Sequence, residues 1–230
     1  MQPDTRLSEI ELRSVSVRFD GKDVLTAVDA TLSAARIAVI GANGSGKSTF
    51  ARLLNGLVAP TSGSVRVLGL DTVDDRAELR RRVGFVFTNP DAQILLPTPA
   101  EDLALSLRGR DRREVEHRVA QTLAEHGLAA HADTPAAALS GGQKQMLALA
   151  SVLITEPDLI VADEPTTLLD LRNARRIGEL LLEQQAQLVL VTHDLDLAAQ
   201  CDAAVLFDDG RIADVGEPAD LIRRYRRLSA

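Results

Sequence analysis

The residues best suited to chemistry in this chain form one run of nine. They are Gly41, Ala42, Asn43, Gly44, Ser45, Gly46, Lys47, Ser48 and Thr49. The run fits the pattern G-x-x-x-x-G-K-[ST], whose glycines let the backbone curl until its N–H groups face an anion. Apolar residues 37–40 predict a buried strand before it, and apolar residues at helical spacing predict a helix N-terminus after it. A glycine turn without a ligand would need neither neighbour. We therefore expect all nine residues to bind a nucleotide triphosphate, with Lys47 on the β- and γ-phosphates and Ser48 on Mg²⁺.

Two carboxylates end a second segment of interest, in which the apolar residues 159–162 lead into Asp163 and Glu164. An acidic residue at the carboxyl end of a buried strand, beside a phosphate loop, is where a metal ligand belongs. Solvated acids at a strand end would look the same in isolation, but the phosphate loop upstream favours a site. We expect Asp163 to hold the metal through water. Glu164, pointing the other way, would orient or deprotonate the attacking water.

A third segment opens a helix between these two. It contains Ser140, Gly141, Gly142 and Gln143. Ser140 is a good N-cap, but a cap alone does not explain two glycines in the first turn, which cost helix stability. Paired glycines let backbone N–H groups approach an anion, so we expect a second helix N-terminus that faces phosphate.

The segments between these motifs predict how they are positioned. Residues 10–19 and 24–32 alternate like strands, residues 63–70 and 83–87 form short strands, and residues 98–157 have helical character. Thr98 and Glu101 form a capping-box pattern, and residues 111–125 a charged amphipathic helix. Strands at 159–162, 188–191 and 204–207 then alternate with helices at 171–185, 195–200 and 219–228. This order predicts an α/β fold with a mostly parallel sheet, preceded by an antiparallel β layer.

Composition narrows the class of protein further. The 230 residues suit one α/β domain, and the 45% hydrophobic but only 3% aromatic content requires an aliphatic core. The net charge of −7 argues against a nucleic-acid partner. A lone cysteine permits a reducing compartment. Residues 1–10 have no apolar segment typical of a signal peptide, and no apolar run approaches the length of a membrane span. We therefore expect a soluble, cytosolic chain.

In their order, these motifs resemble those of the nucleotide-binding subunit of an ATP-binding cassette (ABC) transporter, over essentially the whole chain. Residues 41–49 are similar to its Walker A loop, 139–143 to its LSGGQ signature and 159–164 to its Walker B strand. Residues 168–170 resemble its D-loop, His193 its switch histidine and Phe19 its adenine-stacking aromatic residue. The resemblance implies a single P-loop NTPase domain, 1–230. Its RecA-like core and β layer would take up about 1–95 and 158–230, and a helical signature subdomain about 96–157.

The resemblance also implies a mechanism that uses ATP and Mg²⁺. It implies that two cassettes pair head to tail as a homodimer, so that Ser140, Gly141, Gly142 and Gln143 would act on the ATP of the other chain. Hydrolysis then releases the pair and converts ATP binding into motion. Taken alone, His193 would be a surface or structural histidine, and Phe19 a core residue. After a buried strand, His193 is better explained as a γ-phosphate contact, and Phe19, at a strand end, as a stacking residue.

One position departs from the family. After the strand at 83–87 the family usually carries a glutamine, which meets Mg²⁺ and the membrane partner, whereas this chain has Thr88. We expect the Thr88 hydroxyl to bind metal-bound water with a shorter reach. Gln93 could replace the family's glutamine, but it lies farther along the chain from the strand at 83–87 than that glutamine does. The sequence therefore predicts ATP binding with weakened hydrolysis or coupling.

Among ABC transporters, residues 85–93 resemble the FQNPDxQ stretch of energy-coupling-factor (ECF) importers, and residues 98–104 their T-V-E-E-D-V-A run. Residues 164–173 and 36–57 look most like the biotin-uptake ATPase of this group. The resemblance implies an integral membrane coupling (T) component, a substrate-binding (S) component and a peripheral place at the cytoplasmic face of the membrane. Cobalt or nickel uptake is the nearest alternative, and a soluble switch ATPase acting on a macromolecule is the second function class. The basic cluster at residues 223–227 is better explained as a solvated helix than as a lipid contact.

Overall fold

The computed structural model describes residues 9–228. The expectation that no signal peptide is present rests mainly on residues 1–8, which lie outside the described residues. Six strands form the larger sheet, in the order β10-β9-β3-β8-β7-β6. Their bounds are β3 Arg36–Gly41, β6 Val83–Val86, β7 Leu159–Asp163, β8 Gln187–Val191, β9 Ala203–Asp208 and β10 Arg211–Gly216. All neighbouring pairs are parallel except β9 and β10.

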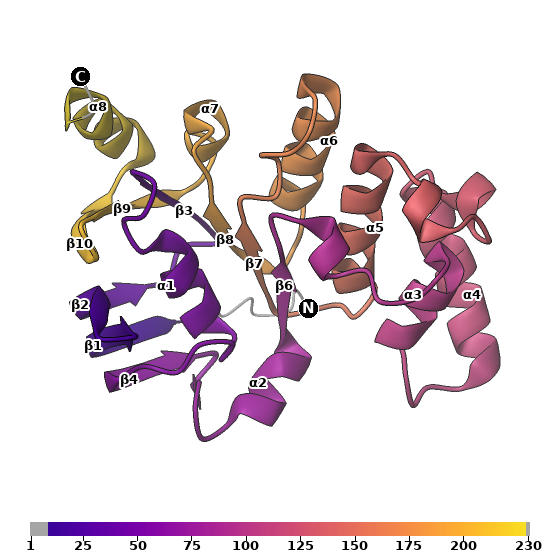
Figure 1. The fold of residues 1–230 in the computed structure, drawn as a ribbon, viewed down its shortest axis with the longest axis horizontal. Coiled ribbons are helices and arrows are strands. Elements are labelled where there is room, and N and C mark those ends of the chain that lie inside the picture. Colours follow the sequence, from indigo (N-terminus) through magenta and orange to yellow (C-terminus); the bar gives the residue numbers. More distant parts are fainter. Residues whose placement is uncertain (1–8, 229–230) are drawn as a thin grey trace, which may run out of the picture.

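A smaller antiparallel sheet, in the order β2-β1-β4-β5, packs against one face of the larger sheet (Figure 1). Its strands are β1 Ile10–Phe19, β2 Lys22–Leu32, β4 Ser62–Val67 and β5 Leu70–Asp71. Helix α1 (Lys47–Leu54) lies between the two sheets, where the rings of Phe50 and Phe207 are 5.2 Å apart. This is the antiparallel β layer that the sequence predicts.

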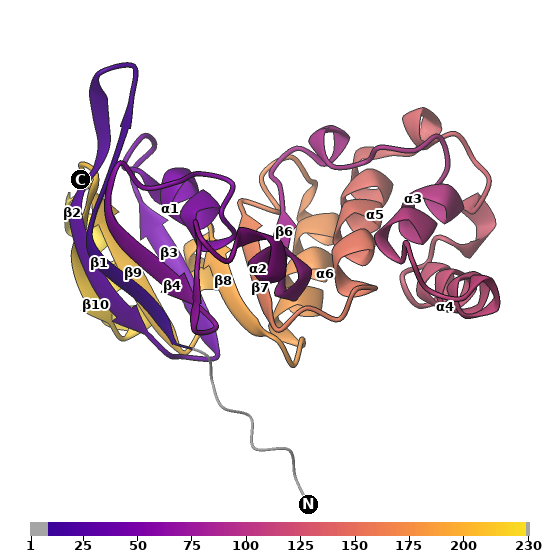
Figure 2. The same cartoon turned by 90° about the horizontal axis from the view of Figure 1, so that it is seen from below.

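Helices cover the opposite face and one end. Helices α6 (Leu171–Leu182), α7 (Leu195–Ala198) and α8 (Pro218–Leu228) lie along the face away from the small sheet (Figure 1). Helices α3 (Pro99–Ser106), α4 (Arg112–Glu125) and α5 (Gly141–Leu153) gather at the end opposite the β layer (Figure 2). The remaining helical elements are α2 Arg76–Arg82, η1 Pro90–Ala92, η2 Ala129–His131 and η3 Ala136–Ala138.

Strand β3, which leads into the phosphate loop, is anchored from both sides. Its alternate residues enter opposite cores, because side chains on a strand alternate between its faces. Ala38 and Ile40 join the core under α5 to α7, and Ile37 and Val39 join the core between the two sheets. Strands β7 and β8 are buried at every residue, as expected for parallel strands covered on both faces. The carboxyl ends of these strands are therefore held rigidly.

Several elements differ from the sequence prediction. The predicted strand at 63–70 is interrupted after Val67, because Leu68 and Gly69 adopt positive φ angles, and β5 follows as a separate strand. The sequence analysis did not predict α2 or β10. The signal for β10 was present, since Asp209-Gly210 is a two-residue hairpin turn and both residues have positive φ. None of the helices within residues 9–228 is long and apolar enough to span a bilayer.

Candidate nucleotide-binding site

The phosphate loop joins β3 to α1 and needs glycine at two positions for different packing reasons. Gly41 has a φ of +146°, and a Cβ there would lie 2.3 Å from the Phe207 carbonyl oxygen. Gly46 caps α1 with a φ of +102°, and a Cβ there would lie 2.6 Å from Leu25 Cδ2. Neither position has room for a side chain, so the neighbouring strands fix the curl of the loop.

Lys47 folds back over this loop. Its Nζ donates hydrogen bonds to the carbonyl oxygens of Gly41 at 2.9 Å and Ala42 at 2.8 Å, and the residue is almost fully buried. Burial lowers the pKa of the ammonium, while the nearby carboxylates of Glu164 and Asp163 raise it. An ammonium has three N–H donors. Two are used here, which leaves one for a phosphate oxygen.

The loop also has polar groups that fit a polyphosphate. The Ser45 hydroxyl is buried and has no hydrogen-bond partner among the described residues. The first main-chain N–H groups of a helix lack intrahelical acceptors and carry partial positive charge. An orphaned donor beside such a helix start is what a bound anion would satisfy, so the residues present fit the nucleotide that the motif predicts.

Two oxygen atoms meet at the edge of this loop where the sequence predicts Mg²⁺. Ser48 Oγ donates a hydrogen bond to Asp163 Oδ1 at 2.8 Å, and Asp163 is buried at the end of β7. Burial raises the pKa of Asp163, opposed by the Ser48 hydrogen bond and by the charge of Arg52, whose Nη2 lies 3.9 Å from Asp163 Oδ2. Hard oxygen donors suit Mg²⁺, which is usually held by one or two carboxylates together with phosphate and water. Residues 9–228 contain no cluster of three or more His, Cys, Asp or Glu side chains that could hold a metal by themselves.

Glu164 and His193, the two residues predicted to act in hydrolysis, lie close together. His193 Nδ1 lies 3.4 Å from Glu164 Oε2, with the glutamate side chain 19% exposed and the histidine 55% exposed. Thr167 Oγ1 donates a hydrogen bond to the same oxygen at 3.0 Å. Glu164 adopts a φ of +50°, in the left-handed region, which costs a glutamate more than it costs glycine, asparagine or aspartate. Strain of this kind is found where surrounding structure fixes a functional residue.

Thr88 and Gln93 are both engaged with the protein itself. The Thr88 hydroxyl donates to the main-chain oxygen of Asp163 at 2.7 Å. The Gln93 amide donates to the Ala148 carbonyl at 2.6 Å and accepts from the Phe87 N–H at 3.2 Å, which ties it to α5. Gln93 is therefore not free to replace the missing glutamine. A role for Thr88 near the metal stays a prediction.

The signature residues form a capped helix start at some distance from the phosphate loop. Ser140 Oγ accepts from the Gln143 N–H at 3.3 Å, and Gln143 Oε1 accepts from the Ser140 N–H at 2.8 Å, a reciprocal capping box. Helix α5, which Ser140 and Gly141 begin, stands apart from α1 in both views (Figures 1 and 2). One chain thus presents two separate helix N-termini suited to anions.

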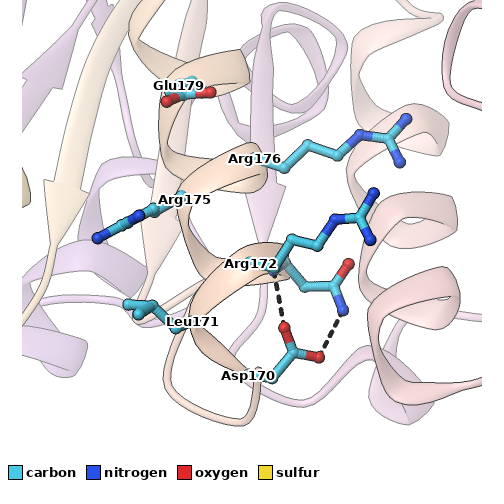
Figure 3. A pocket seen from close by; sticks show the side chains of 7 residues that line it. Asp170, Leu171, Arg172, Arg175, Arg176 and Glu179 are labelled. Carbon is cyan, nitrogen blue, oxygen red and sulfur yellow. Dashed lines mark hydrogen bonds between the residues drawn. The ribbon is translucent and has the colours of Figure 1, made fainter.

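Gly142 lies against the start of α6. A Cβ on Gly142 would come within 2.6 Å of the Asn173 side-chain amide. That amide donates to Asp170 Oδ2 at 2.7 Å, and the Asn173 N–H donates to Asp170 Oδ1 at 2.9 Å. Asp170 and Asn173 line an open hollow of about 750 Å³. Figure 3 shows the two bonds to Asp170, with the Arg172 and Arg176 side chains extending to one side of α6 and Arg175 to the other. The signature helix is therefore in contact with the first turn of α6, where Asn173 bonds back to Asp170 at the end of the D-loop segment.

Phe19 is not a core residue. It ends β1 opposite Lys22, beside the Asp20-Gly21 turn, and is 46% exposed. An exposed aromatic ring is free to stack on a planar base. The sequence analysis missed Arg52 and Thr167. Their spacings, four residues after Ser48 on one helix and three after Glu164, are signals that could have indicated them.

The comparisons with known proteins agree with this geometry. A sequence profile described as "ABC transporter" matches residues 25–167, more than half of the chain. The chain belongs to the ABC transporter family. A profile described as "Imidazolonepropionase-like composite domain, bacteria" matches residues 203–226 alone, a stretch outside the site.

Several relatives match this ABC cassette along its length. A putative ABC transporter ATP-binding protein of Deinococcus radiodurans is 47% identical over 219 residues, covering 94% of this chain and 97% of that protein. The biotin transport ATP-binding protein BioM of Rhizobium etli is 42% identical over 223 residues, covering 96% and 99%. The energy-coupling factor transporter ATP-binding protein EcfA1 of Lacticaseibacillus paracasei is 41% identical over 199 residues, covering 84% and 72%.

Solved structures confirm the predicted fold. The cbiO1 protein of Clostridium perfringens, described as part of the ABC transporter complex cbiONQ, superposes with a TM-score of 0.82 at 28% identity, covering 96% of this chain and 92% of that one. A dimeric ATP-binding cassette in a post-hydrolysis state, bound to ADP and Pi, superposes with a TM-score of 0.79 at 29% identity, covering 91% and 98%. The chain is an ATP-binding subunit of the ABC transporter type and an ATPase.

Proposed function

We propose that this ABC cassette hydrolyses ATP for an energy-coupling-factor importer of a vitamin, with biotin as the first candidate. The observation that carries the proposal is the 42% identity with BioM over 96% of this chain and 99% of that protein. The identity of 41% with EcfA1 supports the energy-coupling-factor class. Among the relatives named above, BioM is the one whose description names a cargo, which favours biotin uptake over the two alternatives, a cobalt or nickel importer and a non-transport switch ATPase.

At the nucleotide, each residue would act through the geometry described above. The buried Lys47 ammonium and Ser45 hydroxyl, with the N–H groups of the first turn of α1, would bind the phosphates, and the exposed Phe19 ring would stack on adenine. Ser48 and Asp163 would hold Mg²⁺. The ion, when bound, would neutralise charge on the phosphate oxygens.

Hydrolysis would be carried out by Glu164, which follows β7, and His193, which lies just after β8. Glu164 would accept the proton of the attacking water, because it is a carboxylate close to the phosphate loop and within Coulombic reach of Lys47. His193, which follows β8 and is 55% exposed, would donate a hydrogen bond to the γ-phosphate. Glu164→Gln keeps the size of the side chain and removes the base, so it should bind ATP, lose turnover and trap the ATP-bound dimer.

A second copy of the cassette would complete the site. The signature residues Ser140 to Gln143 stand apart from α1 within one chain, so they would act on the ATP of the partner (Figures 1 and 2). Leu168, in the D-loop segment, and Leu171, directly after it, are 64% and 69% exposed. Large apolar side chains exposed this close together are typical of a surface that another protein covers. A head-to-tail homodimer would cover them.

The membrane components would dock beside the signature helix. An open hollow of about 460 Å³ is lined by Asp91, Lys144, the residues 94–97 and the residues 135–137, most of them apolar. Leu95, on its wall, is 71% exposed. An apolar hollow with two charges at its rim suits a short helix of an integral membrane protein. The cassette would then sit peripherally at the cytoplasmic face, on a coupling (T) component joined to a substrate-binding (S) component.

The proposal is tested by affinity purification of the tagged chain from gently solubilised native membranes, with the co-purifying proteins identified. A multi-span membrane protein together with a small membrane protein that retains biotin is the expected result. A metal-binding membrane partner would replace the cargo and keep the importer. Recovery in the soluble fraction alone, with macromolecular partners, would refute the importer.

A further inference from the structure

Two groups, from different segments of the chain, approach one oxygen of Glu164. The Thr167 hydroxyl donates to Glu164 Oε2 at 3.0 Å, and His193 Nδ1 lies 3.4 Å from the same atom. The Thr167 hydroxyl and His193 Nδ1 are themselves 3.5 Å apart. Of the three separations, only the one between Thr167 and Glu164 is within the range of a well-formed hydrogen bond. The threonine is therefore the strongest local restraint on the glutamate side chain.

The backbone forms a turn that places Thr167 close to Glu164. Glu164 turns out of β7 with a φ of +50°, and its N–H donates to the Val191 carbonyl at 2.9 Å. The Thr167 N–H then donates to the Glu164 carbonyl at 3.4 Å, which closes a turn and returns Thr167 over Glu164. The glutamate backbone is thus strained and held from two sides. Its side chain, with several rotatable bonds, would still need a partner to occupy one rotamer.

We propose that Thr167 is the positioning residue for hydrolysis, fixing the Glu164 carboxylate so that one oxygen faces protein and the other faces the reacting water. The hydroxyl proton and His193 occupy the side of Oε2. Oε1 has no hydrogen-bond partner among the described residues and is the oxygen left to accept a proton. The same contact turns Nδ1 of His193 toward the cluster, which leaves Nε2 as the ring nitrogen for a phosphate oxygen.

This inference rests on the proposed role of Glu164 as base, and it predicts a specific pattern of loss. Removing a hydrogen bond to a charged group, where the bond orients a catalytic group, should lower kcat by about tenfold or more. ATP affinity should stay unchanged, because within the described residues the Thr167 hydroxyl makes no hydrogen bond to Lys47, Ser48 or Asp163. A loss confined to kcat is the sign of an interaction that matters in the transition state.

The test compares Thr167→Val, which removes the hydroxyl at nearly constant shape, with Thr167→Ser, which keeps it. The purified full-length chain is assayed for kcat and KM with MgATP, for nucleotide affinity by equilibrium titration, and for melting temperature. Thr31→Val serves as a matched control, because Thr31 is an exposed threonine of β2 outside the site. We expect Thr167→Val to lose at least about tenfold in kcat with nucleotide affinity within about twofold, and Thr167→Ser to restore kcat to within about threefold of the parent.

Glu164→Gln, measured in the same assays, distinguishes a failure of the positioning role of Thr167 from a failure of the role of Glu164 as base. If Glu164→Gln is inactive and Thr167→Val matches the parent, the positioning role is wrong while the role of Glu164 stands. If Glu164→Gln turns over like the parent, Glu164 is not the base, and both fail. A Thr167→Val variant that loses affinity and kcat together, and is not rescued by serine, would also overturn the positioning role, because Thr167 would then be supporting the site as a whole.

Discussion

The packing around Gly46 makes a quantitative prediction for the phosphate loop. In Gly46→Ala the new methyl group would lie 2.6 Å from Leu25 Cδ2 and 3.1 Å from the Val24 carbonyl oxygen, at a φ of +102°. A left-handed backbone costs an L-residue about 1–2 kcal/mol. Overpacking a filled site adds about 1–3 kcal/mol. The free energy of unfolding should therefore fall by about 2–5 kcal/mol, which lowers the melting temperature of a domain this size by about 4–20 °C.

Gly44 offers a control in the same loop. It has a φ of +78°, but a Cβ there would meet no atom within 4 Å. Gly44→Ala should therefore show the backbone strain alone, about 1–2 kcal/mol, and a melting temperature lower by about 2–8 °C. Both variants are measured by thermal and denaturant unfolding without nucleotide, so that loss of ligand binding does not enter the comparison.

The difference between the two variants isolates the contact of Gly46 with β2. If Gly46→Ala and Gly44→Ala lose equal stability, the packing argument is wrong and the conformational cost alone explains the glycine. If Gly46→Ala is as stable as the parent, the backbone of the loop must relax freely. That outcome would contradict the picture of a phosphate cradle held rigidly by β2 and α1.

Three further predictions concern the metal site and the membrane partner. Thr88→Gln gives the side chain a longer reach toward metal-bound water and should raise kcat several-fold, and equal ATPase rates would discard that idea. Asp163→Asn should lower kcat about a hundredfold or more, yet raise the melting temperature without nucleotide at neutral pH. Burial raises the pKa of Asp163, so the stability that this group gives the parent is fully present below the unfolded pKa and is lost as the pH rises through the folded pKa. Asp163→Asn has no carboxyl there and should lose less stability over that window, so melting profiles of equal slope for the two proteins would contradict this. Leu95→Glu should keep the ATPase rate of the isolated chain and lose co-purification of the membrane protein, while retention of that partner would place the docking surface elsewhere.

The segment after β6 links the metal site to the signature helix. Thr88 bonds to the main chain at Asp163, and Gln93 bonds to α5. Gln145, buried on α5, donates to the Phe87 carbonyl at 3.3 Å, and Lys144 pairs with Asp91 at 2.7 Å. The three hydrogen bonds of Thr88, Gln93 and Gln145 are partly buried, and they restrain the elements that they join. A displacement of the hollow between residues 91–97 and Lys144 would therefore shift both the Asp163 segment and the signature helix.

The sequence alone predicted the phosphate-loop motif and most of the helices and strands around it. The spacing of Gly41, Gly46, Lys47 and Ser48 is local, and the strand and helix that flank it follow from short-range apolar periodicity. Ser140 and Gln143 are three residues apart, so their reciprocal cap could also be anticipated. These features can be predicted from the sequence because residues a few positions apart are brought together by local backbone geometry alone.

Only the tertiary structure decided which side chains meet. Ser48 reaches Asp163 across 115 positions of the chain, and Thr88 reaches the same residue across 75. Phe19 is exposed because β1 ends there at a turn, whereas an aromatic residue type alone was equally compatible with a core position. The Gln93 side chain donates a hydrogen bond to α5, and the Thr167 hydroxyl donates one to Glu164. Such contacts depend on how the two sheets and α5 pack against one another, and no local pattern encodes that packing.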